Sequence, residues 1–158
     1  MHGHDYDLEQ DFPNLPVVGW KLTSPVKPSN NCIGWALYDA NQYWDGNVIG
    51  VRGYYWPPGV PKDDSIATWS RVFELHGYVV CKNGVLEPDV EKVAIYADAA
   101  QLATHVARQL ESGAWTSKLG PDEDIEHNTV RGLEGDMYGT VAVYMKRPRL
   151  PYHGDIPS

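Results

Sequence analysis

Two stretches of the chain repeat apolar residues with the period of a helix. The first follows Asn31, a favourable N-cap, and predicts a helix from residue 31 to about residue 41. The second follows Asp63 or Asp64 and ends before Gly77, which stands where a left-handed residue closes a helix. Their apolar faces consist of Ile33, Ala36, Leu37 and Ala40 in the first helix and of Ile66, Trp69 and Phe73 in the second.

Other segments have the alternating or β-branched composition of strands. Ser112 and Gly113 form a turn that joins two of them into a hairpin. A short helix is expected over residues 125–133, after an acidic stretch. The predicted strands are residues 78–81, 92–97, 104–110, 115–119 and 138–146.

Prolines and aromatic residues shape the remaining segments. Residues 1–30 hold four prolines among polar residues, which predicts an extended arm over the surface. Residues 43–61 mix aromatic residues with glycine and proline, which favours an ordered aromatic loop. We therefore expect one α+β domain over residues 1–158, with a core at 31–147 and a tail at 148–158. In its fold, an N-terminal helix packs on an antiparallel sheet.

Composition and charge exclude several classes of function. The net charge of −8 repels phosphate backbones, so nucleic acid is not an expected partner. No run approaches the ~20 apolar residues that span a bilayer, and the N-terminus lacks a signal sequence, so we expect a cytoplasmic protein that does not bind membranes. Cys32 and Cys81 are expected to be free thiols, with Cys81 structural.

The sequence also lacks motifs for cofactors and metals. It has no glycine-rich phosphate loop after a strand, no CxxC pair and no HExxH. The acidic residues near His127 are interpreted as a solvated helix start rather than as metal ligands. No cofactor and no metal are predicted.

Cys32 is the sharpest candidate for chemistry. It lies at the first position of the first predicted helix, where unpartnered backbone N–H groups and the helix dipole favour a thiolate. The same N–H groups, with Asn31 or Asn30, could stabilise an oxyanion. The alternative is that Cys32 is an ordinary buried cysteine, since free cysteine is among the most buried residue types.

His105 is the best candidate for a general base. It lies on the predicted strand 104–110, whereas the other histidines fall in predicted tails or at helix ends. A histidine on a strand can equally be a structural residue with satisfied hydrogen bonds.

The order of these residues resembles the papain-like cysteine peptidase and amidase superfamily, in which a strand-borne histidine meets a cysteine at a helix N-terminus. The resemblance implies a papain-like fold, with Cys32 as nucleophile and His105 as base. Ser117 takes the place of the third group that orients the imidazole, where the family has a stronger orienting residue. In a second registration Lys92 falls at the base position, which implies a non-catalytic relative.

A longer run of residues, from Lys92 to Gly139, resembles an uncharacterised bacterial domain that covers about residues 31–147. This resemblance implies no activity. Two functions therefore stay open. One is a cysteine hydrolase or acyltransferase acting on an amide or thioester of a peptide or small amide substrate. The other is a non-catalytic module, such as an immunity or accessory protein, that binds a protein partner through a surface rich in Trp and Tyr. The residues expected to line the substrate cleft are Trp35, Tyr55, Trp56, Trp115 and Lys118.

Overall fold

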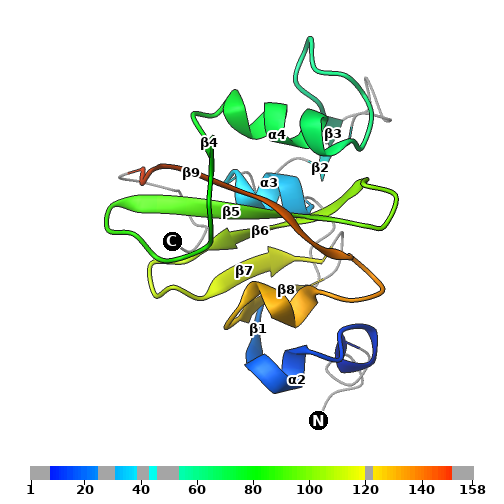
Figure 1. The fold of residues 1–158 in the computed structure, drawn as a ribbon, viewed down its shortest axis with the longest axis vertical. Helices are drawn as coiled ribbons and strands as arrows, with labels where there is room; N and C mark the ends of the chain where they lie inside the picture. The colour runs from blue at the N-terminus through cyan, green and yellow to red at the C-terminus, as the bar shows by residue number, and fades with distance from the viewer. Residues whose placement is uncertain (1–7, 25–30, 39–42, 46–53, 120–122, 151–158) are drawn as a thin grey trace.

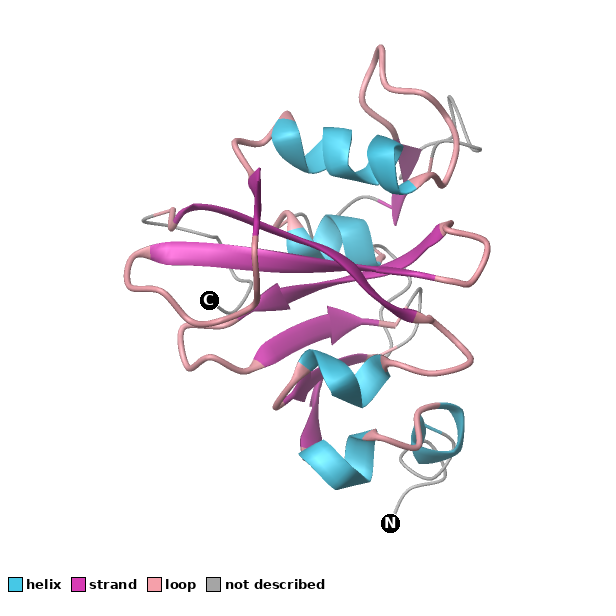
Figure 2. Cartoon of the chain, in the orientation of Figure 1, coloured by secondary structure: helices cyan, strands magenta, loops and turns pink. Residues whose placement is uncertain are grey.

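The computed structural model describes residues 8–24, 31–38, 43–45, 54–119 and 123–150. Within them the chain forms one seven-stranded antiparallel sheet together with helices, so the predicted α+β class is confirmed (Figures 1 and 2). The strand order is β1-β8-β7-β6-β5-β9-β4. The strands are β1 Trp20–Ser24, β4 Val79–Cys81, β5 Val90–Ala97, β6 Ala103–Gln109, β7 Trp115–Lys118, β8 Asp124–His127 and β9 Thr140–Pro148.

The central strands divide the interior into two cores, one on each face of the sheet: the first core contains Cys32 and Val106, and the second core contains Ala107 and Tyr96. Successive side chains of a strand point to opposite faces of the sheet. On β6, Val106 therefore faces a first core, whereas His105 and Ala107 face the other side. Cross-strand partners share a face of the sheet. Tyr96 pairs with His105 and belongs to the second core, so His105 faces that core as well.

Two helices cover the first core. Helix α4, Ile66–Glu74, buries Trp69 and Phe73 as predicted, and Gly77 after it has a φ of 89°. Its N-cap is Ser65, whose Oγ accepts a hydrogen bond from Thr68 N at 3.1 Å, rather than Asp63 or Asp64. Helix α3, Cys32–Ala36, packs against β6 and β7 (Figure 1).

Helix α3 is shorter than the sequence predicts. Asn31 caps it, as expected, but the helix ends at Ala36, and Tyr38 adopts a left-handed φ of 61° that no helix continues through. The end of the predicted helix, at residues 39–41, lies outside the described residues. Within the predicted aromatic loop 43–61, two short strands pair in parallel, β2 Tyr43–Trp44 and β3 Tyr54–Tyr55, so this segment is not purely a loop.

The prediction of an extended N-terminal arm was wrong for residues 8–24, the part of the arm that the structure describes. Residues 8–11 are helical, a short helix α2 follows at Leu15–Val18, and β1 is the edge strand next to β8. Pro16 is compatible with α2 because it lies in the first turn, where the missing N–H is not needed. This segment closes the second core with Leu8, Phe12 and Leu15.

The predicted helix at 125–133 was also wrong. Residues 124–127 form β8, and a 3-10 helix, η1 Val130–Leu133, follows it. Ile125 and His127 face the second core while Glu126 lies partly exposed on the other side, which is the alternation of a strand. The pattern spans four residues, too few to distinguish a strand from a helix by periodicity.

A glycine before β9 provides a test of this architecture. Gly139 has a φ of 78°, and a Cβ added there would overlap the carbonyl oxygen of Ala97. Gly59 has a φ of 81° but no atom within 4 Å of an added Cβ, so Gly59→Ala is the matched control. We expect Gly59→Ala to lower the free energy of unfolding by about 1 kcal/mol, and Gly139→Ala by roughly 3 kcal/mol or more, in urea denaturation. Equal losses in the free energy of unfolding of the two variants would contradict the close packing of the start of β9 on β5.

Candidate functional site

Asn31 is fully engaged in holding α3 against β2. Its Oδ1 accepts hydrogen bonds from Gly34 N at 3.3 Å and from Trp44 N at 3.1 Å. Its Nδ2 donates to Trp44 O at 2.7 Å. The predicted N-cap role is therefore confirmed. The amide group that was expected to stabilise an oxyanion is used by the backbone of β2 instead.

Cys32 is a buried thiol rather than an activated one. It belongs to the first core, and burial raises its pKa to about 11, although backbone groups of Val106 and α3 lower it in part. Desolvation thus outweighs the effect of the helix N-terminus on the pKa of the thiol. Helix α3 is only five residues long. The thiolate expected from the local sequence is not favoured here.

The structure does not bring His105 to Cys32. The backbone of Val106 contacts the thiol, and the neighbouring His105 points to the opposite side of the sheet. There its ring stacks on Tyr138, with ring centroids 4.3 Å apart, and lies 5.4 Å from the ring of Tyr96. Neither ring nitrogen has a hydrogen-bond partner in the described part of the chain. Lys92, the alternative base, also faces away from Cys32.

Ser117 pairs with a different histidine. Its Oγ lies 2.8 Å from His127 Nε2, and His127 Nδ1 lies 2.8 Å from the carbonyl oxygen of Thr129. This network assigns the proton to Nδ1, so that Nε2 accepts from the serine hydroxyl. Both side chains have 0% exposure, and burial lowers the pKa of His127 to about 4. The pair resembles a nucleophile and its base, but no solvent or substrate reaches it.

The residues expected to line one cleft are dispersed. Trp35 Nε1 donates to Thr116 Oγ1 at 3.0 Å, and Trp56 Nε1 donates to Pro61 O at 3.0 Å. Tyr55 packs edge-on against Trp44 on the first core, whereas Trp115 is buried in the second. Lys118 is 1% exposed and lies 3.8 Å from Asp124. Trp115 thus lies on the other side of the sheet from Tyr55 and Trp56, so the structure does not gather the predicted lining residues on one face.

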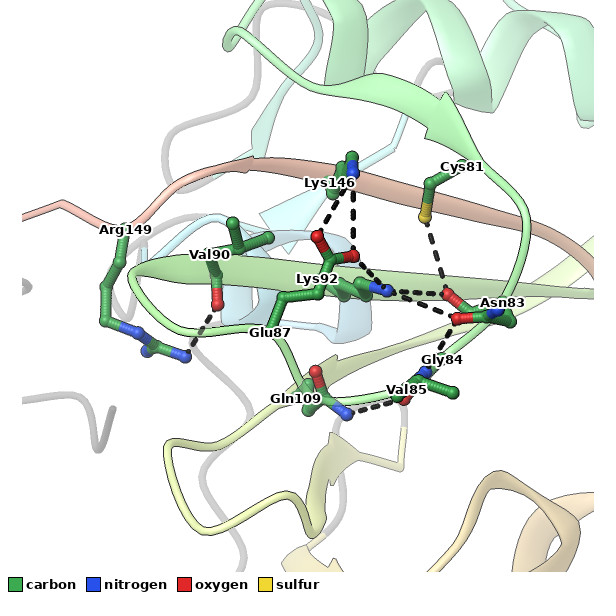
Figure 3. Close-up of polar contacts among 10 residues, drawn as sticks. All are labelled: Cys81, Asn83, Gly84, Val85, Glu87, Val90, Lys92, Gln109, Lys146 and Arg149. Atoms are coloured by element: carbon green, nitrogen blue, oxygen red, sulfur yellow. Dashed lines mark hydrogen bonds and ion pairs between the residues drawn. The ribbon is translucent and has the colours of Figure 1, made fainter.

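A solvent-open cavity of about 350 Å³ lies beside β4 instead. Figure 3 shows the polar contacts of several residues that line it. We name this cavity the basic pocket. Lys92, whose side chain is 1% exposed, contacts Glu87 at 2.7 Å and donates to Asn83 O at 3.0 Å. Lys146 also contacts Glu87, at 3.2 Å, and both lysines lower the pKa of that carboxyl. The lining residues are Val80, Cys81, Lys82, Asn83, Glu87, Lys92 and Lys146.

Sequence reasoning missed this pocket because its lysines come from three different strands or their ends, one of which is distant in sequence. Lys82 follows β4, Lys92 lies on β5 and Lys146 lies on β9. Only the pairing of β9 with both β4 and β5 brings them together. In the sequence, each is an isolated lysine.

The described residues contain no group of three or more His, Cys, Asp or Glu side chains that could hold a metal ion. Within the same residues, no helix combines the length and the apolar character that crossing a membrane requires.

Comparison with known families places the chain in one of them. Residues 21–146 match the family described as "Domain of unknown function (DUF7689)", and the chain belongs to this family. No curated protein and no solved structure matches the chain. The expected resemblance to an uncharacterised domain is therefore confirmed, while no structural neighbour supports the papain-like fold.

The two cysteines should differ in their reactivity toward iodoacetamide. Cys32 is buried and Cys81 is half-buried, so Cys81 should be labelled in the native protein and Cys32 only at the rate of unfolding. Mass spectrometry of each cysteine over a urea series measures this difference. Rapid labelling of Cys32 in the native protein that becomes slower in His105→Phe would instead support the predicted catalytic pair.

The buried histidines should make the protein sensitive to acid. Burial lowers the pKa of both His105 and His127, the latter to about 4, so both are neutral when folded, whereas in the unfolded chain they bind protons near pH 6.5. The unfolded state thus holds more protons below that pH. Stability should fall as the pH decreases from about 6.5 toward about 4, by up to about 1.4 kcal/mol per pH unit for each histidine.

His105→Phe tests this origin of the acid sensitivity in urea denaturation across the same pH range. It removes one proton-binding site and two unpartnered buried nitrogens, so the slope of stability against pH should decrease. Tyr138→Leu is the control, because it removes the stacked ring without removing a titrating imidazole. It should lower stability but keep the slope. An unchanged slope in His105→Phe would show that His105 is protonated in the folded protein.

Proposed function

We propose that this domain is a non-catalytic binding module that takes up an extended, acidic segment of a partner protein alongside β4. The observation that carries this proposal is the exposed apolar edge of the sheet at β4. An edge strand presents unpaired backbone N–H and C=O groups, to which a further strand can be added.

The edge at β4 is unusually apolar. Val79 is 58% exposed and Val80 is 66% exposed, and among the described strands β4 pairs only with β9. Natural proteins commonly protect such edges with charged residues. Five of the eleven exposed large hydrophobic residues in the described chain fall between residues 75 and 86, namely Leu75, Val79, Val80, Val85 and Leu86. A concentration of this kind favours an interaction site.

The apolar surface is aliphatic rather than aromatic. All six tryptophans of the sequence are described, and each is buried or half-buried. A binding surface rich in Trp and Tyr, which the sequence had suggested, therefore finds no support among the described residues. The aliphatic edge takes its place in this proposal.

The charge beside β4 determines the chemistry of the partner. The basic pocket brings together Lys82, Lys92 and Lys146 with a single carboxylate, Glu87, in a protein whose net charge is −8. The lysines thus give this surface a local positive charge that complements an acidic side chain. An extended segment with β-branched residues facing the edge and an acidic residue facing the pocket satisfies both features.

A cysteine hydrolase has much weaker support. Its nucleophile would be a buried thiol with a raised pKa, and its base would lie on the other side of the sheet. Nucleophilic catalysis needs the base within hydrogen-bond reach of the nucleophile.

Selection from a displayed library of random peptides tests the binding module directly. Peptides enriched on the native protein should combine β-branched and acidic residues and should shift the NMR signals of residues 79–81. Val80→Lys places a charge on the edge and should weaken their binding about tenfold or more, since protected edges resist strand addition.

Val17→Lys is the matched control, because Val17 is 80% exposed and lies on α2, outside the β4 edge. It should leave peptide binding unchanged. Peptides that bind Val80→Lys as tightly as the native protein, or a failure to enrich any peptide, would exclude the proposal. Self-association that is lost in Val80→Lys, measured by sedimentation, would identify a second copy of the chain as the occupant instead.

A further inference from the structure

One carboxylate serves two lysines in the basic pocket. Glu87 Oε2 lies 2.7 Å from Lys92 Nζ, and Glu87 Oε1 lies 3.2 Å from Lys146 Nζ (Figure 3). The two lysines come from the neighbouring strands β5 and β9, on which they are cross-strand partners, so their side chains share a face of the sheet. Two ammonium groups thus receive one carboxylate group, with a lysine close to each of its oxygens.

The lysines are held by the sheet, whereas the carboxylate belongs to a loop. The side chain of Lys92 is 1% exposed, and its Nζ also donates to Asn83 O at 3.0 Å and lies 3.4 Å from Asn83 Oδ1. The side chain of Glu87 is 37% exposed, and residues 82–89 around it form neither helix nor strand. Loops rearrange more readily than the strands that they connect. The lysine pair is therefore the fixed half of this ion pair, and Glu87 is the half that can be exchanged.

Open space borders Glu87 on two sides. Glu87 lines the basic pocket, and it also lines a second solvent-open cavity of about 370 Å³. The other residues that line the second cavity are Leu86, Pro88, Asp89, Glu111 and Arg149. A ligand therefore reaches the lysines through the basic pocket, while the second cavity gives the Glu87 side chain room to turn away from them.

Charge determines what can replace Glu87. Lys92 is nearly excluded from solvent, and a buried ammonium group without an opposite charge is strongly destabilising. The acceptors that Asn83 provides are neutral, so they do not replace the negative charge of Glu87. Lys82 lines the same pocket as a third cation. An anionic ligand thus approaches three ammonium groups and has one resident carboxylate to displace.

We propose that Lys92 and Lys146 form a carboxylate-binding site, which Glu87 occupies in the free protein and an acidic side chain of the partner occupies in the complex. The exchange rests on the function proposed above, whereas the carboxylate site itself does not. Glu87 is attached to the same chain as the lysines, so its effective concentration is high. A free carboxylate is therefore a poor competitor, and an acidic segment displaces Glu87 only with the additional contacts that it makes along β4. The resident carboxylate thus makes binding selective for segments that satisfy both features.

Chemical rescue by acetate tests the carboxylate site without any partner. Glu87→Gln keeps the size of the side chain but leaves Lys92 without an anion, so it should lower the melting temperature. Sodium acetate at constant ionic strength should raise the melting temperature of Glu87→Gln saturably, because acetate takes the place of the lost carboxylate. Acetamide, which has the same shape but no charge, should have no such effect. The native protein should respond to neither solute.

Glu111→Gln is the matched control, since it removes one carboxylate from the second cavity, and the side chain of Glu111 is 65% exposed. It should not respond to acetate. Adding Lys146→Met to Glu87→Gln should weaken the acetate response, because one of the two lysines is lost. If Glu87→Gln does not fold in chloride, folding in acetate reports the same rescue. No saturable response of Glu87→Gln, or an equal response of the native protein, would overturn the site.

Acidic peptides selected on the native protein test the exchange. They should bind Glu87→Gln about tenfold more tightly, because the resident carboxylate reduces the fraction of the protein whose site is free. They should bind Glu111→Gln with nearly native affinity. Equal affinity for Glu87→Gln and the native protein would overturn the exchange, although peptide binding at β4 would stand. If no peptide is enriched, the partner and its exchange are excluded, and acetate rescue decides on the site alone.

Discussion

The alternation of side chains along β6 is the constraint on which the rest of the structure depends. Val106 and Arg108 face α3, whereas His105 and Ala107 face the N-terminal segment, because neighbours on a strand cannot share a face. This single strand separates the thiol of Cys32 from the imidazole of His105. It therefore decides against a catalytic pair and leaves each residue in a core of its own.

Both faces of the sheet bury polar groups, and each face has a distinct set of partners. On the α3 face, Glu91, Arg147 and Tyr38 form a connected network. On the other face, Ser117 and His127 bond to each other and to the backbone. Removing one member of such a network leaves a desolvated group without a partner, which is costly. We infer that these networks fix the strand register, while the surface beside β4 remains available for binding.

The sequence predicted the regular elements with strong periodic patterns and missed what depends on tertiary neighbours. Helix α4 was found from its apolar spacing, strands β5 and β6 from their apolar and β-branched composition, and β7 from the turn at Ser112 and Gly113 that precedes it. The raised pKa of Cys32 could not be found, because the helix-start pattern is local, whereas the burial of the thiol comes from core residues far along the chain, such as Phe73 and Ile95. The alternation within β6 was visible in the sequence, but the face that α3 covers was not.

The exposed edge was hidden for a topological reason. Val79 and Val80 have the composition of an interior strand, and the next strand along the chain is β5. In the sheet, however, β9 from the C-terminal part of the chain inserts between β4 and β5. The insertion leaves β4 at the edge and brings Lys146 of β9 into the basic pocket beside Lys82 and Lys92.

The most direct test of this account is a nuclear Overhauser measurement on the folded protein that locates the side chains on either side of β6. The account predicts cross-peaks from the His105 ring to the Tyr138 and Tyr96 rings, and from the Cys32 methylene to protons of Val106. Cross-peaks between the Cys32 methylene and the His105 ring would contradict it, because they require both residues on one face of the sheet.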